Sequence, residues 1–193
     1  MLIKLIVGLG NYGCKYDGTR HNLGSYYVNL LAKRYKLSFV KKKQFSSLVG
    51  KFVIFNNLIH LLIPTTYMNL SGEAVAAMSS FYNFLPANIL IVHDELDLMP
   101  GIIKLKFGGS HAGHNGLKNI INKLGCNQFY RLRIGIGRPK HNSEIVNFVL
   151  SKPPFNEKQT IHNILNKVIN YTEYVVNKNI IQVMNKLHSN IIN

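Results

Sequence analysis

The stretch that decides the fold runs from Gly8 to Gly24 and reads G-L-G-N-Y-G-C-K-Y-D-G-T-R-H-N-L-G. An apolar run over about residues 2–8 leads into it and predicts a buried strand. The first part, Gly8 to Gly13, spells G-x-G-x-x-G, the turn after which a dinucleotide-binding domain opens a helix on the pyrophosphate. Here a polar loop follows instead, and a helix is predicted only from about Asn22. The stretch therefore leaves open a cofactor enzyme or a cofactor-free hydrolase.

Strands and helices alternate along the rest of the chain. Pro153 and Pro154 precede a helical C-terminal region at about 155–188. This order predicts an α/β fold, a single domain over 1–193 with a twisted, mixed, mostly parallel central sheet flanked by helices. Apolar periodicity places further strands at about 37–41, 46–55, 59–63, 89–92, 102–107 and 131–137, and helices at about 22–35, 68–83 and 115–124.

Length and composition favour one folded domain. The chain has 193 residues, of which 47% are hydrophobic, enough to bury a substantial core. No apolar run reaches the roughly 20 residues that cross a bilayer, and the N-terminus lacks the pattern of a signal peptide. The two cysteines, Cys14 and Cys126, lie far apart and are typical of free thiols in a reducing compartment. We therefore expect a cytoplasmic protein with no membrane partner.

The net charge is strongly positive. Lys and Arg number 23 against 8 acidic residues, which gives a formal charge of +15. Such a field attracts polyanions and accelerates encounter with them. The alternative is a compositional bias toward Lys, Asn and Ile. The charge therefore favours nucleic acid as the partner, but charge alone does not establish nucleic-acid binding.

Polar side chains gather after several predicted strands, at 11–21, 64–69, 93–97 and 108–115. The carboxyl ends of parallel strands meet at one edge of a sheet, so these groups are expected to share a site. Among them His21 and Asp94 form a natural acid–base pair. A carboxylate that accepts from one imidazole nitrogen makes the other nitrogen a better base. Glu95 and Asp97 compete with Asp94, which could instead cap a helix or turn.

No side-chain nucleophile stands out. Ser110 lies in G-G-S-H-A-G, which lacks the second glycine of a nucleophile elbow. Cys14, seven residues before His21, could pair with it, but nothing else around it indicates an activated thiolate, and a passive loop thiol is favoured. An activated water is therefore the expected attacking species.

A metal could activate that water in place of a base. His111 and His114 have the H-x-x-H spacing of metal ligands, and His93 or Asp94 could complete a site. The two spaced histidines lie in a glycine-rich loop rather than on a helix, and no cysteine cluster supports them. We expect no metal.

Three asparagines follow predicted strands: Asn11, Asn69 and Asn115. A neutral carboxamide can donate to a carbonyl or a developing oxyanion. The alternative is structural, with Asn11 in a turn and Asn69 and Asn115 capping helices.

Basic residues flank the glycine-rich loop. Lys104 and Lys106 lie two residues apart on one predicted strand, and Arg131 and Arg133 do so on another, so each pair shares a face. With Lys118 near a helix N-terminus they could clamp phosphates, although charges on a sheet face are more often merely solvated.

A dinucleotide-dependent oxidoreductase is the first rival function. It requires an acidic residue about 20 residues beyond the glycines to bind the ribose. Residues 30–34 are Leu-Leu-Ala-Lys-Arg, so that residue is missing.

Several motifs, in order and at compatible spacing, carry a family resemblance along nearly the whole chain. They are Gly8–Asn11 with Tyr16 and Thr19–Asn22, Pro64 with Thr66–Gly72, His93–Asp97, Gly108–Gly109 with His114–Leu117, Arg131–Gly137, and Phe148–Leu150 with Lys152–Pro154. On these motifs the chain resembles bacterial-type peptidyl-tRNA hydrolases. The resemblance implies a cofactor-free, typically monomeric and cytoplasmic enzyme that cleaves the ester between a peptide and tRNA.

The resemblance also implies roles for single residues. His21 matches the general base that acts on water, and Asp94 matches the aspartate that orients it. The match places Lys104, Lys106 and Arg133 near the tRNA phosphates. It places a further group along the site or against the peptidyl-adenosine end: Asn11, Tyr16, Met68, Asn69 and Asn115.

Departures from the family pattern are few. Tyr12 stands where a proline is usual, which frees the local φ angle and leaves the pose of Asn11 less defined. Ser110 and Ala112 replace glycines common in their loop. The second rival function, a non-catalytic RNA-binding relative on the same scaffold, would be expected to lack His21 or Asp94, and this chain has both.

Overall fold

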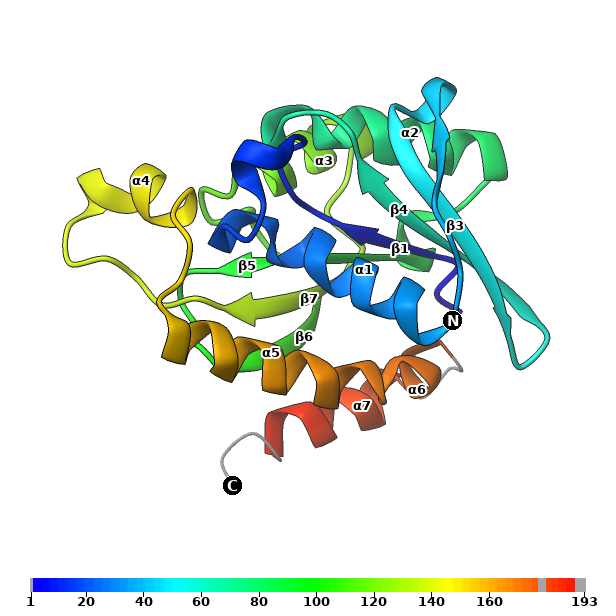
Figure 1. Cartoon of the computed structure of the whole chain (residues 1–193). Coiled ribbons are helices and arrows are strands. Elements are labelled where there is room, and N and C mark those ends of the chain that lie inside the picture. Colours follow the sequence, from blue (N-terminus) through cyan, green and yellow to red (C-terminus); the bar gives the residue numbers. More distant parts are fainter. Residues whose placement is uncertain (1, 177–179, 190–193) are drawn as a thin grey trace.

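The computed structural model describes residues 2–176 and 180–189, and within them seven strands form one sheet in the order β2-β3-β4-β1-β5-β7-β6 (Figure 1). The strands are β1 (Leu5–Gly8), β2 (Val40–Lys42), β3 (Ser47–Ile54), β4 (Asn57–Pro64), β5 (Ile89–Glu95), β6 (Ile103–Phe107) and β7 (Tyr130–Gly135). The helices are α1 (Leu23–Arg34), α2 (Ser71–Tyr82), α3 (Asn115–Leu124), α4 (Ile145–Val149), α5 (Phe155–Ile169), α6 (Thr172–Val176) and α7 (Ile180–Ser189).

The centre of the sheet is parallel and its edges are antiparallel. β4, β1, β5 and β7 run parallel to one another. β2 and β3 add antiparallel strands at one edge, and β6 does so at the other. The predicted mixed sheet with helices is therefore confirmed. β3 and β4 form a hairpin whose two-residue turn is Phe55 and Asn56, since Ile54 pairs with Asn57.

Several predicted boundaries were wrong by a few residues. β5 extends to Glu95, beyond the apolar run that ends at Val92, because Asp94 and Glu95 are buried among polar partners rather than in apolar surroundings. The strand expected at 37–41 is the short, exposed β2. The helix expected from residue 68 opens with a 3-10 turn, Met68–Leu70, before α2.

Helices cover both faces of the sheet and create two apolar cores. Alternate residues of a strand point to opposite faces. In β1, Ile6 joins the core that α1 and α5 cover, while Leu5 and Val7 join the core under α2 and α3. The two cores bury the four central strands on both faces and hold their carboxyl ends in fixed relative positions.

Glycines allow α1 to begin directly on the end of β1. A Cβ on Gly24 would lie 2.1 Å from the Val92 carbonyl oxygen, and a Cβ on Gly8 would lie 2.5 Å from the Gly24 carbonyl oxygen. Ser25 donates its backbone N–H to the Leu9 carbonyl oxygen at 2.8 Å. Gly8 thus allows the end of β1 to pack closely against the start of α1. The polar loop of residues 11–22 connects the two elements.

The described part of the predicted helical region at about 155–188 forms α5, α6 and α7, and residues 177–179 of that region lie outside the described residues. α5 buries Ile161 and Leu165 in the core that α1 shares. α7 lies against β6, where Ile180 and Val183 are buried. No helix in the described ranges 2–176 and 180–189 is long and apolar enough to cross a membrane.

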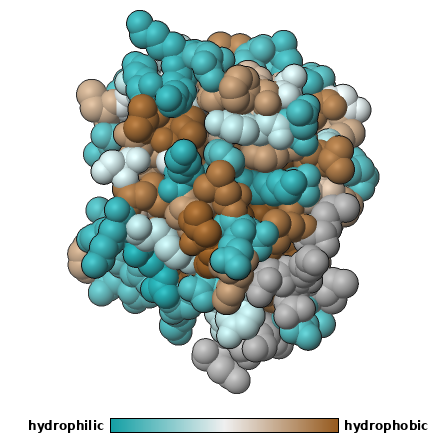
Figure 2. All heavy atoms as spheres, turned by 90° about the vertical axis from the view of Figure 1, so that its right-hand side faces the viewer, coloured by the Kyte–Doolittle hydropathy of each residue, from teal (hydrophilic) through white to brown (hydrophobic). Residues whose placement is uncertain are grey.

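Apolar and polar side chains intermingle on the face at the right of Figure 1 (Figure 2). The β3–β4 hairpin exposes Val53, Phe55 and Leu58. Scattered exposed apolar side chains are ordinary on protein surfaces, so this face gives no sign of the site.

The contact between Gly24 and β5 can be tested by adding one methyl group. Gly24→Ala forces the start of α1 away from Val92 and is expected to destabilise the protein by about 1–3 kcal/mol, the usual cost of overpacking. Lys33→Ala, on the exposed face of the same helix, is expected to change stability by less than about 0.5 kcal/mol. Urea unfolding of both variants measures the difference, and equal stabilities would contradict the close-packing argument.

Candidate active site

A cavity of about 520 Å³ opens at the carboxyl ends of β1, β4 and β5. The predicted polar clusters converge there, as expected for parallel strands. Its walls come from the loops after β1 and β4, the end of β5, the loop before α3, and α4. The lining residues are Asn11, Tyr16, His21, Tyr67, Met68, Asn69, Asp94, Glu95, Leu96, Ala112, Gly113, His114, Asn115, Ile145, Val146, Val149 and Leu150.

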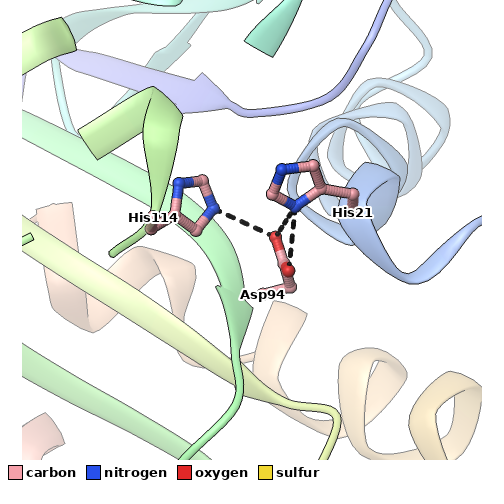
Figure 3. Close-up of side chains that lie close together, drawn as sticks. All are labelled: His21, Asp94 and His114. Atoms are coloured by element: carbon pink, nitrogen blue, oxygen red, sulfur yellow. Dashed lines mark hydrogen bonds and ion pairs between the residues drawn. The ribbon is translucent and has the colours of Figure 1, made fainter. Parts of the chain in front are cut away.

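His21 and Asp94 form a buried pair at the floor of this cavity (Figure 3). Nδ1 of His21 lies 3.0 Å from each carboxylate oxygen of Asp94. A carboxylate only accepts, so Nδ1 carries the proton and donates it. The Nε2 atom of His21 is then left with a free lone pair, the form required of a base.

A second imidazole binds the same carboxylate. Nε2 of His114 lies 3.1 Å from Oδ1 of Asp94. Nδ1 of His114 accepts the backbone N–H groups of Gly116 and Leu117 and so caps α3. Because that nitrogen must keep its lone pair, the proton of neutral His114 lies on Nε2 and is donated to Asp94. Asp94 therefore accepts from two histidines and is fixed from both sides.

Charge and burial shift the pKa values of the pair in defined directions. Burial lowers the pKa of His21, but the charge of Asp94 and its hydrogen bond outweigh burial, and the pKa is raised above 6.5. Burial alone would raise the pKa of the Asp94 carboxyl, but the two imidazoles that face it hold that pKa well below its usual range. Asp94 is thus a permanent carboxylate at neutral pH.

His21, Asp94 and His114 are also close enough together to be considered as metal ligands. Their potential ligand atoms lie within 4.8 Å of one another, and no other such group is found among the residues that the structure describes. Ligation by His114 through Nε2 would require a lone pair on that atom and a proton on Nδ1. Nδ1 already accepts two backbone N–H groups. The geometry favours hydrogen bonding over metal ligation. The predicted H-x-x-H pair does not form a joint site, since His111 accepts the Gly113 N–H instead.

His93 points away from the carboxylate and packs behind it. Its ring lies edge-on to that of His114 with centroids 5.0 Å apart, and its Nδ1 lies 2.6 Å from the Asp94 carbonyl oxygen. Burial, with the nearby His114, lowers the pKa of His93 to about 3. It is a buried, neutral side chain behind Asp94 and is not among the residues that line the cavity.

Asn11 is held in place at both its backbone and its side chain. Its carboxamide oxygen accepts the Met68 N–H at 2.8 Å, so its Nδ2 group is left as a donor. The Asn22 side chain accepts the Asn11 N–H at 2.8 Å and donates to the Asn11 carbonyl oxygen at 2.9 Å. Tyr12 donates its N–H to the Thr66 carbonyl oxygen, a bond that proline could not form. The pose of Asn11 is therefore defined despite Tyr12.

Arg20 ties the His21 loop to the chain that follows α4. Its guanidinium binds both carboxylate oxygens of Glu157 at 2.8 Å and the Ser151 hydroxyl at 2.6 Å. Its side chain is only 6% exposed, and it stacks 4.2 Å from the Phe148 ring centroid. Buried bidentate pairs of this kind are rigid. Arg20 thus fixes α4, one wall of the cavity, relative to His21.

The remaining predicted cavity residues lie where expected. Tyr16 and Met68 line the wall, Met68 being buried. Asn69 is exposed in the 3-10 turn before α2, and Asn115 is the first residue of α3. Neither asparagine caps its helix by a side-chain bond. The cap of α3 is His114, which corrects the structural alternative for Asn115.

The predicted phosphate-binding residues lie outside the cavity, on β6 and β7. Lys104 pairs across the strands with Arg133, and Lys106 with Arg131. Lys104 and Lys106 are exposed, and so is Lys118 on α3. Arg133 is bound to Glu95 at 2.8 Å.

Arg131 was wrongly grouped with the surface cations. It is 3% exposed, and it donates to the carbonyl oxygens of Gly109 and Ser110. It therefore holds the glycine-rich loop in place and is not available to a phosphate.

Sequence reasoning missed other parts of the site. It considered His114 only as a metal ligand, although the position of this histidine at a helix start could have suggested a cap. It did not identify Tyr67 or Glu95 as lining residues. It also missed α4, a five-residue helix whose apolar side chains close the cavity.

In comparisons with known proteins, the family profile, the curated relatives and the solved structures with high similarity to this chain carry the same description. A family profile described as peptidyl-tRNA hydrolase matches residues 5–193. The peptidyl-tRNA hydrolase of Sodalis glossinidius is 50% identical over 190 residues, covering 98% of each chain. That of Yersinia pseudotuberculosis is 52% identical over 188 residues, 97% of this chain and 96% of the relative. A crystal structure of peptidyl-tRNA hydrolase from Acinetobacter baumannii has a TM-score of 0.93 at 42% identity, covering 97% of this chain and 95% of that one.

Removing the charge of Asp94 should reverse the pKa shift of His21. In Asp94→Asn the charge and the carboxylate hydrogen bond are lost while burial remains, so the pKa of His21 is expected to fall from above 6.5 to below it. NMR titration of the imidazole resonances measures this change. His93, with a pKa of about 3, should stay neutral in both proteins. An unchanged pKa of His21 would contradict the assigned pair.

Proposed function

Because this chain belongs to the peptidyl-tRNA hydrolase family, whose activity is that of a carboxylic ester hydrolase, we propose that it hydrolyses peptidyl-tRNA with a water activated by His21. The observation that carries this proposal is the hydrogen bond from Nδ1 of His21 to Asp94, which leaves Nε2 as a free base beside the cavity.

The proposed reaction is an ester hydrolysis with one water. Nε2 of His21 takes a proton from the water, whose oxygen attacks the ester carbonyl carbon. The bond to the ribose oxygen then breaks, and that oxygen receives the proton from the imidazolium. The products are a peptide with a free carboxylate and a tRNA with a free 3′-terminal hydroxyl. A positioned base contributes about 10²–10⁴ to the rate of such a step.

Asp94 stabilises the imidazolium that forms on His21. Because His114 also donates to Asp94, the carboxylate cannot rotate away from His21. Nδ1 of His114 accepts backbone N–H groups at the start of α3, which fixes the orientation of this ring. In this proposal His21 moves the proton. Asp94 and His114 hold the His21 ring in the productive orientation.

The asparagines are proposed to bind the polarised carbonyl. Nδ2 of Asn11 is free to donate, because the oxygen of that carboxamide accepts from Met68. Asn69 and Asn115 line the same cavity with further amide donors. Such donors stabilise the negative charge that develops on the carbonyl oxygen. Tyr16 and Met68 are proposed to hold the peptidyl-adenosine end.

Lys104, Lys106 and Arg133 are proposed to bind tRNA phosphates on the β6–β7 flank of the cavity. The two lysines are exposed on one face of β6. Arg133 keeps part of its guanidinium accessible while bound to Glu95, its side chain being 22% exposed. The formal charge of +15 supports a polyanionic substrate. We propose that the enzyme is a cytoplasmic monomer that uses neither cofactor nor metal.

Loss of the base should slow turnover without loss of binding. His21→Ala is expected to reduce kcat by about 10²–10⁴ and to leave tRNA affinity largely unchanged. The measurement is release of peptide from purified peptidyl-tRNA, with His141→Ala, an exposed histidine, as the matched control. Near-wild-type hydrolysis by His21→Ala would overturn the role of the base.

Phosphate contacts should appear in the salt dependence of binding. The double variant Lys104→Gln, Lys106→Gln is expected to weaken tRNA binding and to reduce the slope of log K against log salt by about 1.8, the value for two duplex phosphates. Lys33→Gln, Lys51→Gln removes two exposed lysines elsewhere and should keep the slope. If both double variants retain the wild-type slope, the β6 lysines do not bind phosphate.

A further inference from the structure

Exposed lysines lie on opposite flanks of the cavity. Lys104 and Lys106 belong to β6, at one edge of the sheet, and Lys41 belongs to β2, at the other edge. The cavity lies between these edges, at the ends of β1, β4 and β5. The lysines of the β6 flank have a role in the proposed function, whereas Lys41 on the β2 flank has none.

Tyrosine rings accompany the cations on the β2 flank. We call this group the tyrosine–lysine patch; it comprises Tyr12, Lys15, Tyr16, Lys41 and Tyr67. The Lys41 ammonium lies 5.5 Å from the ring centroid of Tyr12, and that of Lys15 lies 5.7 Å from the ring of Tyr16. The rings of Tyr16 and Tyr67 meet edge-to-face at 6.4 Å.

The patch is accessible and continuous with the cavity wall. Tyr12 is 50% exposed and Tyr67 is 60% exposed. Tyr16 and Tyr67 line the cavity itself. Tyr12 directly follows the cavity residue Asn11 and is joined by its N–H to Thr66, next to Tyr67. A chain that leaves the cavity past Tyr16 and Tyr67 therefore reaches Tyr12 and Lys41.

The lysines of the patch have no carboxylate partner in the part of the chain that the structure describes. There, five of the eight acidic side chains pair instead with Arg20, Lys123, Arg133 and Arg138 and with the histidines of the site. The exposed Asp17 adjoins Tyr16 but forms no ion pair with Lys15 or Lys41. The ammonium groups of Lys15 and Lys41 each lie over a tyrosine ring. A cation held over a ring at an exposed site keeps most of its charge available to an anion.

We propose that the tyrosine–lysine patch binds the peptide arm of the substrate and favours peptides with acidic side chains in the residues before the ester-linked one. The inference rests on the proposed function, in which the ester occupies the cavity. The tRNA leaves the ester toward the β6 lysines, and the peptide must leave in another direction. The tyrosines offer apolar surface to any peptide, and Lys15 and Lys41 add the charge preference.

A basic, aromatic surface could also bind single-stranded RNA. Its place on the flank opposite the proposed phosphate site favours the peptide, because one acceptor end cannot run both ways from the ester. Binding of RNA here is therefore treated as an outcome that contradicts the proposal.

The test compares substrates that differ only in the peptide. N-acetylated tripeptidyl-tRNAs carry the same tRNA and the same ester-linked residue, and the two preceding residues are both glutamate, both glutamine or both lysine. For the wild-type enzyme kcat/KM is expected to decrease in that order, by about two- to five-fold per step, the size of exposed charge pairs. Lys41→Gln should reduce the differences in kcat/KM between the three substrates. Lys41→Glu should reverse their order, so that the lysine substrate is cleaved with the highest kcat/KM. Lys51→Gln, on the neighbouring strand β3, should retain it.

Each alternative result has a distinct meaning. Equal kcat/KM for the three substrates in the wild type overturns the inference and leaves the proposed function intact. If Lys41→Gln lowers kcat/KM equally for all three substrates, and also reduces the salt dependence of binding to free tRNA, the patch binds RNA. This result also overturns the inference. If the wild type cleaves none of the substrates, it is the proposed function that fails.

Discussion

The carboxylate of Asp94 accepts a hydrogen bond from each of two imidazoles, and the organisation of the site depends on this bridge. From one side it fixes His21 with Nδ1 protonated at 3.0 Å, and from the other it accepts Nε2–H of His114 at 3.1 Å. Because the other nitrogen of His114 caps α3, the carboxylate is connected to a helix start as well as to the loop that carries His21. A buried charge that accepts hydrogen bonds from two imidazoles resists rotation, and this rigidity gives Nε2 of His21 a defined direction.

Backbone packing places the bridge. Gly8 and Gly24 let α1 start in contact with β1 and β5, so His21, three residues before Gly24, stands over the end of β5. Asn22 then fixes the backbone of Asn11, and Arg20 fixes α4 through Glu157 and Ser151. Neighbouring residues of one short segment thus orient a base, an amide donor and a wall of the cavity. This packing accounts for Gly8 and Gly10 of the G-x-G-x-x-G pattern, and a positive φ of 112° accounts for Gly13.

Much of this arrangement could be predicted from the sequence because it follows from local patterns. Apolar runs located the central strands, and polar clusters after them located the cavity, including His21, Asp94 and Asn11. The rest depends on contacts between distant segments. The bridge to His114 joins residues 20 positions apart, and the burial of Arg131 arises from the carbonyl groups of the 108–113 loop. α4 is too short for periodicity to reveal, and its role comes from the Arg20 contacts across the fold.

The tautomers of the two histidines test the central claim most directly. Long-range ¹H–¹⁵N correlation spectra of the protein labelled at imidazole nitrogen, recorded at a pH above the pKa of His21, distinguish protonated from unprotonated ring nitrogens. The account predicts a proton on Nδ1 of His21 and on Nε2 of His114, with both shifts altered in Asp94→Asn. A proton on Nε2 of His21 in the wild type would leave no lone pair facing the cavity and would contradict the account.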